Sequence, residues 1–152
     1  MYIEVIQAVW SSMRIFFDPD TLHQSKMGSV TGVVYFEFSP DRHFPSVGWN
    51  DFVVVLATWW MAALEKLVEG QSKVDFLFVD GPYWITATFQ GTCVLLQCTQ
   101  DRRGADLPYE VVVQMDDLKR QLLTFARNAS AACKGARIQS TDLDGLRRLL
   151  PN

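Results

Sequence analysis

Residues 73–99, KVDFLFVDGPYWITATFQGTCVLLQCT, decide the fold of this chain. Apolar and polar side chains alternate over Lys73–Val79 and again over Tyr83–Phe89. A period of two residues is typical of a strand with one buried face. The turn-forming residues Asp80-Gly81-Pro82 separate the two runs. Because connections this short join antiparallel neighbours, the stretch predicts three consecutive antiparallel strands, the third over Thr92–Thr99.

Further strands are predicted on both sides of this stretch. Ser29–Phe38 alternates in the same way, and Tyr109–Val113 forms a fourth strand after the third. Residues 1–17 are rich in β-branched and aromatic side chains, which favours one or two strands. A helix over Tyr2–Met13 is the alternative for that region. Pro19, between two aspartates, is expected to interrupt whichever element forms.

A long helix is expected before the strands of residues 73–99. The run Phe52–Leu64 is apolar apart from one threonine, so the helix is predicted to be buried on more than one side. It would lie between a sheet and a second helix, or under a partner chain. Asn50 or Asp51 is the expected N-cap or first-turn acid, and Gly70 is the expected C-terminal glycine.

The carboxyl-terminal part is predicted to be helical. Asp116-Asp117 begins a helix that ends at Gly135, and Thr141 with Asp144 resembles a capping box that opens a short last helix. The expected class is α+β. An antiparallel sheet of about five or six strands carries a long central helix and C-terminal helices packed mainly on one face. A single domain over residues 1–152 is expected.

Composition narrows the class of protein. The 152 residues are 49% hydrophobic and carry a formal net charge of −3, which suits a chain with its own core and argues against disorder. The Lys and Arg residues form no basic stripe, so nucleic acid is not an expected partner. The three cysteines lack metal spacing and predict buried free thiols in a reducing compartment. With no signal peptide and no span long enough for a membrane, a cytoplasmic protein is expected.

Few residues carry a signature of chemistry. The two histidines, His23 and His43, have no metal-ligand spacing to each other or to a cysteine. Neither a Gly-rich phosphate loop nor a GxSxG elbow is present in the sequence. We therefore expect no catalytic site, no metal, no cofactor and no enzymatic activity. Trp59 and Trp60 point about 100° apart on a helix, so at least one is expected in the core, and the second is a candidate interface anchor.

Two segments in the middle of the chain carry a family resemblance. Residues 44–60, FPSVGWNDFVVVLATWW, resemble a segment of the form FPxxxWxDFxxxxLxWW, and residues 76–83, FLFVDGPY, resemble FxFxDGPY. In this order they are similar to small bacterial immunity proteins found beside polymorphic or contact-dependent toxins. The resemblance implies a protein that binds its cognate toxin domain and blocks the toxin's active site stoichiometrically. It brings no catalytic residues with it.

In that interpretation the motif residues maintain the scaffold, while loops contact the toxin. The candidate partner-binding residues lie in two charged loops and beside the hairpin between them: Asp41, Arg42, His43, Asp80, Trp84, Asp101, Arg102, Arg103 and Asp106. The alternative function is a non-catalytic small-ligand-binding or regulatory subunit of a larger assembly, and the apolar Phe52–Leu64 helix motivates it. The oligomeric state stays open.

Overall fold

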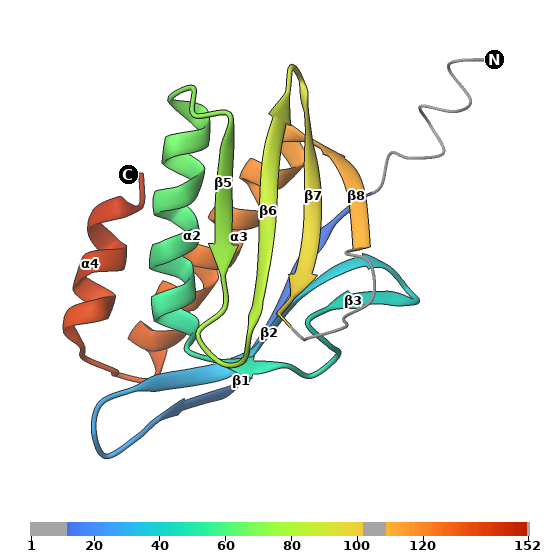
Figure 1. The fold of residues 1–152 in the computed structure, drawn as a ribbon. Helices are drawn as coiled ribbons and strands as arrows, with labels where there is room; N and C mark the ends of the chain where they lie inside the picture. The colour runs from blue at the N-terminus through green and yellow to red at the C-terminus, as the bar shows by residue number, and fades with distance from the viewer. Residues whose placement is uncertain (1–11, 102–108, 152) are drawn as a thin grey trace.

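A computed structural model describes residues 12–101 and 109–151 of the chain (Figure 1). This part contains eight strands and three helices, which confirms the α+β class. The elements are β1 (Arg14–Gln24), β2 (Val30–Ser39), β3 (Arg42–Phe44), β4 (Asn50–Asp51), α2 (Val53–Val68), β5 (Lys73–Leu77), β6 (Tyr83–Gln90), β7 (Cys93–Gln100), β8 (Tyr109–Gln114), α3 (Met115–Gly135) and α4 (Thr141–Leu149). No helix in these residues is long and apolar enough to cross a membrane.

The strands of the described residues form two antiparallel sheets of four strands each, where one sheet of five or six was expected. The first has the order β1-β2-β3, with β4 also paired to β2. The second is the predicted meander β5-β6-β7-β8. The additional strands β3 and β4 are very short, and they lie in segments whose prolines and cap-forming residues indicate loop and helix start. Pairing with β2 makes them strands: β3 forms a tight hairpin with the end of β2, and β4 pairs with Gly32 and Val33.

The interruption expected at Pro19 occurs within β1. Regular pairing with β2 ends at Asp18 and resumes at His23, and the intervening residues bulge out. The hydroxyl of Thr21 bridges the bulge, because it donates to the carbonyl of Asp18 at 2.6 Å and accepts from the N–H of Val33 at 2.8 Å. β1 is an edge strand, where a proline and a bulge are tolerated. The choice between strand and helix for residues 1–11 lies outside the described residues.

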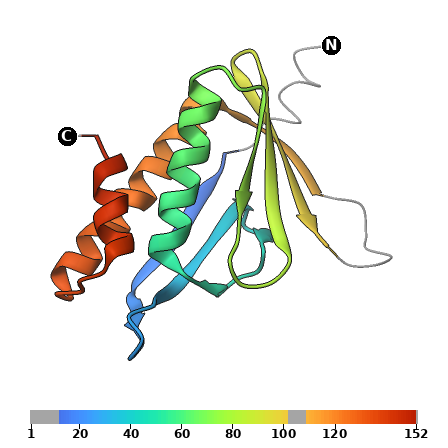
Figure 2. The same cartoon turned by 60° about the vertical axis from the view of Figure 1, so that its left-hand side comes forward.

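Helix α2 is buried on several sides by its own chain. This matches the expected arrangement in which it lies between a sheet and a second helix. It packs against β5, α3 and α4 (Figures 1 and 2). The ring of Trp60 is fully buried, with ring centroids 5.2 Å from Phe36, 5.2 Å from Phe78 and 5.4 Å from Phe125. Trp60 therefore joins the first sheet, the second sheet and α3 in one core.

The two ends of α2 differ in how well they were predicted. Gly70 has φ +112° and directly follows the C-cap residue, so the predicted C-terminal glycine is confirmed. The predicted cap at Asn50 or Asp51 is wrong. The N-cap position is Phe52, without a side-chain hydrogen bond, and the two polar residues form β4 instead. The carboxylate of Asp51 instead accepts hydrogen bonds from the side chain of Trp49 and from the backbone of Asp80.

The last helices complete the core. Helix α3 ends at Gly135 as predicted, and its Gln121 accepts a hydrogen bond of 3.0 Å from the N–H of Ile15 on β1. Helix α4 is capped one residue earlier than expected. Ser140 is the N-cap and accepts from the N–H of Leu143 at 3.0 Å, while Thr141 is the first helical residue.

Replacing Ser140 by alanine is expected to lower the free energy of unfolding by about 1 kcal/mol, because one N–H at the start of α4 loses its acceptor. Urea denaturation of the variant measures this loss. Thr141→Ala is the matched control and should change stability by less than about 0.5 kcal/mol. A larger loss of unfolding free energy from Thr141→Ala than from Ser140→Ala would mean that Thr141, and not Ser140, caps the helix.

Candidate partner-binding site

The buried carboxylate of Asp51 joins the two segments that carry the family resemblance. Asp51 is 1% exposed. Its Oδ2 accepts from the indole N–H of Trp49 at 2.9 Å, and its Oδ1 accepts from the N–H of Phe52 at 2.7 Å. The backbone N–H of Asp80 donates to both oxygens, at 3.3 and 3.1 Å. Charge-assisted bonds of this kind are stronger than neutral ones, so the carboxylate holds the start of α2 against the β5–β6 connection.

Aromatic packing supports the same junction. The ring of Tyr83 meets the edges of Trp49 and Phe44, with centroids 5.0 and 5.7 Å apart. Gly81 has φ +76°, and a Cβ there would lie 2.8 Å from the Tyr83 ring, so this turn requires glycine. The residues that the sequence indicated as scaffold therefore lie together.

Four of the candidate partner-binding residues are exposed around this junction. We call the surface made by Asp41, Arg42, Asp80 and Asp101 the hairpin end. Three contacts hold its turns together. The guanidinium of Arg42 lies 4.5 Å from the ring centroid of Tyr109 at the start of β8. The N–H of Asp101 donates to the carbonyl of Pro82 at 2.9 Å, and the Phe44–Tyr83 ring contact joins β3 to β6.

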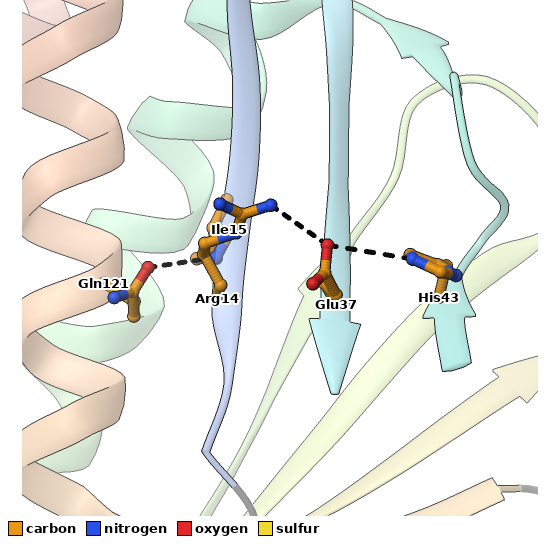
Figure 3. A network of polar contacts seen from close by, with 5 residues as sticks. All are labelled: Arg14, Ile15, Glu37, His43 and Gln121. Atoms are coloured by element: carbon orange, nitrogen blue, oxygen red, sulfur yellow. Dashed lines mark hydrogen bonds and ion pairs between the residues drawn. The ribbon is translucent and has the colours of Figure 1, made fainter. Parts of the chain in front are cut away.

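His43 follows Arg42 in sequence, but its side chain lies on the outer face of the first sheet (Figure 3). Its Nε2 is 3.7 Å from Oε2 of Glu37, and the same oxygen is 3.1 Å from Nη2 of Arg14. The His43 ring also meets the edge of Tyr35 at 5.6 Å. Sequence reasoning missed Arg14 and Glu37 as partners of this histidine. The alternation of β2, which sends Tyr35 and Glu37 away from the core, is the signal that pointed to this face.

Trp84 lies apart from the hairpin end, on the outer face of the second sheet. It pairs across the strands with Leu77 and Thr99 and is partly buried. Leu77 is 45% exposed, and with Trp59, which is 44% exposed, it lines a groove of about 340 Å³ between α2 and β5. The prediction that at least one of the paired tryptophans lies in the core is confirmed by Trp60, which is fully buried.

Some backbone carbonyls on the outer edge of β5, beside this groove, already accept hydrogen bonds from side chains of the same chain. The N–H of Phe78 bonds to the carbonyl of Tyr83 on β6, so alternate residues, including Leu77, direct their backbone groups away from the sheet. The carbonyl of Leu77 accepts from the indole N–H of Trp60 at 2.8 Å, and that of Lys73 accepts from Gln71 at 3.1 Å. Occupied carbonyls make the edge a poor template for an added strand.

Arg102, Arg103 and Asp106 lie outside the described residues. Within the described ranges, no group of three or more His, Cys, Asp or Glu side chains is placed to hold a metal ion. Cys98 and Cys133 are buried as predicted, whereas Cys93 is partly exposed. Burial raises the pKa of the Cys98 thiol to about 12, so this thiol stays protonated at neutral pH.

Comparisons of the chain with protein-family models, with curated proteins and with solved structures found no match. The features that bear on function are therefore the geometry of the site and the two segments at residues 44–60 and 76–83. Those segments meet at Asp51, and the charged turns that they support form the hairpin end.

Proposed function

We propose that this protein is a cytoplasmic immunity protein that binds a cognate bacterial toxin domain and neutralises it by covering the toxin's active site. It acts stoichiometrically, without catalysis, metal or cofactor, and its partner is neither nucleic acid nor membrane. The observation that carries the proposal is the hairpin end. Three turns there carry exposed charged side chains, and the contacts of Arg42 with Tyr109, Asp101 with Pro82 and Phe44 with Tyr83 connect these turns to the scaffold around the buried Asp51 carboxylate.

The charge of the hairpin end suits recognition of a basic protein surface. Among the candidates that the structure describes, Asp41, Asp80 and Asp101 contribute three exposed carboxylates and Arg42 contributes one guanidinium. Complementary charges steer association and select between partners. A local acidic patch does this even where the net charge of the chain is only −3.

The alternative function, a small-ligand-binding or regulatory subunit, began from the hydrophobicity of α2. Within the described residues that hydrophobicity is accounted for by packing against β5, α3 and α4. A helix covered on several sides by its own chain needs no ligand or partner subunit to explain its apolar surface. The hydrophobicity of α2 therefore no longer favours the alternative.

The proposal is tested by co-expression with the toxin domain encoded by the neighbouring gene. The wild-type protein should co-purify with that domain in a one-to-one complex and restore growth to cells that express it. Asp41→Lys combined with Asp101→Lys reverses two charges of the hairpin end and should weaken the complex by about tenfold or more, a cost of about 1.4 kcal/mol.

The matched control is Glu65→Lys combined with Glu69→Lys, which makes the same change of net charge on exposed residues near the far end of α2. This control should bind and protect as the wild type does. The immunity function is refuted if the wild type neither forms the complex nor restores growth. Equal weakening by both pairs would remove the hairpin end as the binding surface.

A further inference from the structure

A groove of about 530 Å³ is lined by residues of α3 and of the α4 segment, on a different part of the fold from the hairpin end. The two helices lie beside each other in Figure 2. Its lining combines three basic residues with one hydroxyl and two apolar side chains: Arg127, Ser130, Ala131, Lys134, Arg147 and Leu150. This lining contains no carboxylate. In a chain of net charge −3, the groove is a local concentration of positive charge.

The three basic side chains are available to a ligand. Arg127, Lys134 and Arg147 are exposed, and none forms an ion pair within the described part of the chain, whose ion pairs involve Glu37 and Asp117 instead. Unpaired cations that share a groove repel one another, and an anion between them relieves that repulsion.

The three basic residues of the groove come from both helices. Arg127 and Lys134 are seven residues apart on α3, two turns along the same face, or about 10 Å along the axis. Arg147 belongs to α4, and its charge reaches toward α3. Burial raises the pKa of the Cys133 thiol, and the nearby positive charge of Arg147 offsets part of that rise.

The spacing of the cations matches that of side chains along an extended peptide. Arg127 and Lys134 start about 10 Å apart along the axis of α3, and residues three apart in an extended chain also span about 10 Å. Ala131 and Leu150 offer apolar contact between the charges. We propose that the groove between α3 and α4 docks an acidic segment of a protein partner, in which carboxylates alternate with apolar side chains.

The test uses a fluorescein-labelled peptide, Gly-Glu-Glu-Leu-Glu-Glu-Leu-Gly, titrated with the full-length protein and followed by fluorescence anisotropy in about 50 mM salt. The peptide should bind, and amide signals of α3 and α4 should shift in NMR spectra. A peptide with lysine in place of glutamate should not bind. Arg127→Glu combined with Arg147→Glu should weaken binding of the acidic peptide by about tenfold or more, because two attractive charges become repulsive.

Lys119→Glu combined with Lys73→Glu is the matched control, since both lysines are exposed, outside the groove, and give the same change of net charge. Binding should fall by less than about twofold in this control. The proposal is overturned by equal weakening in both pairs, by shifts confined to other elements, or by no binding. It is also overturned if a DNA duplex or phosphatidylserine vesicles bind the same residues more tightly than the peptide. None of these measurements requires the toxin, so they are independent of the proposed immunity function.

Discussion

The Asp51→Ala variant is expected to lose about 3–5 kcal/mol of folding free energy. Removing the carboxylate leaves the indole N–H of Trp49 and the backbone N–H groups of Phe52 and Asp80 without their acceptor. Each buried donor left unsatisfied costs about 1–3 kcal/mol, and water that enters the junction offsets part of the sum. Urea denaturation with tryptophan fluorescence measures the change.

Asp80→Ala is the informative control for this prediction. Asp80 donates from its backbone N–H, and its own side chain is exposed, so alanine keeps the bond to Asp51. Its stability should stay within about 0.5 kcal/mol of the wild type. A similar loss in both variants would mean that the hydrogen bonds of Asp51 are not what holds the junction.

Replacing Trp60 by alanine is the second change with a large expected effect. The indole is fully buried among Phe36, Phe78 and Phe125, and its N–H bonds to the carbonyl of Leu77. Truncating a buried tryptophan costs about 3–5 kcal/mol through lost transfer energy and the cavity left behind. The loss is measured as a lower midpoint of denaturation with an unchanged far-ultraviolet circular dichroism spectrum in buffer.

The adjacent Trp59 supplies the matched comparison. It is 44% exposed and lines the groove beside β5, so Trp59→Ala should cost less than about 1.5 kcal/mol. The same chemical change one residue apart thus separates the core side of α2 from its outer side. Equal losses from the two variants would contradict the placement of Trp60 at the centre of the core.

Local patterns account for the parts of the fold that were predicted. The meander from β5 to β7 follows from alternation and turn residues, and the buried face of β2 at Val34, Phe36 and Phe38 follows from the same period. The burial of α2 follows from its apolar circumference. These features depend on residues close together in sequence, and for that reason they can be recognised without knowing what lies across the core.

The features that were missed depend on contacts and backbone geometry that the local composition does not indicate. Asp51 looks like a helix cap, and its use as an acceptor for Asp80 depends on a contact across 29 residues. The short strand β3 exists because it pairs with β2, and that register directs His43 toward Glu37. The cap at Ser140 differs from the expected Thr141 by one residue, a distinction that backbone geometry decides.

The candidate site was predicted in part. Its charged turns were recognised from their composition, and the structure brings Asp41, Arg42, Asp80 and Asp101 to one end. The side chain of His43 and that of Trp84 lie on outer sheet faces instead, because alternation along a strand sends neighbouring side chains to opposite sides. The basic groove between α3 and α4 was not recognised, since its residues come from two helices whose packing the sequence does not state.

The junction at Asp51 has a consequence for how this surface diversifies. The carboxylate of Asp51 accepts hydrogen bonds from the backbone N–H of Asp80. Every residue except proline supplies a backbone N–H, so the side chain at position 80 is free to change. The side-chain charge at position 80 can therefore change at little cost in folding free energy. The buried carboxylate of Asp51 holds the junction, and the exposed side chain at position 80 takes no part in that contact.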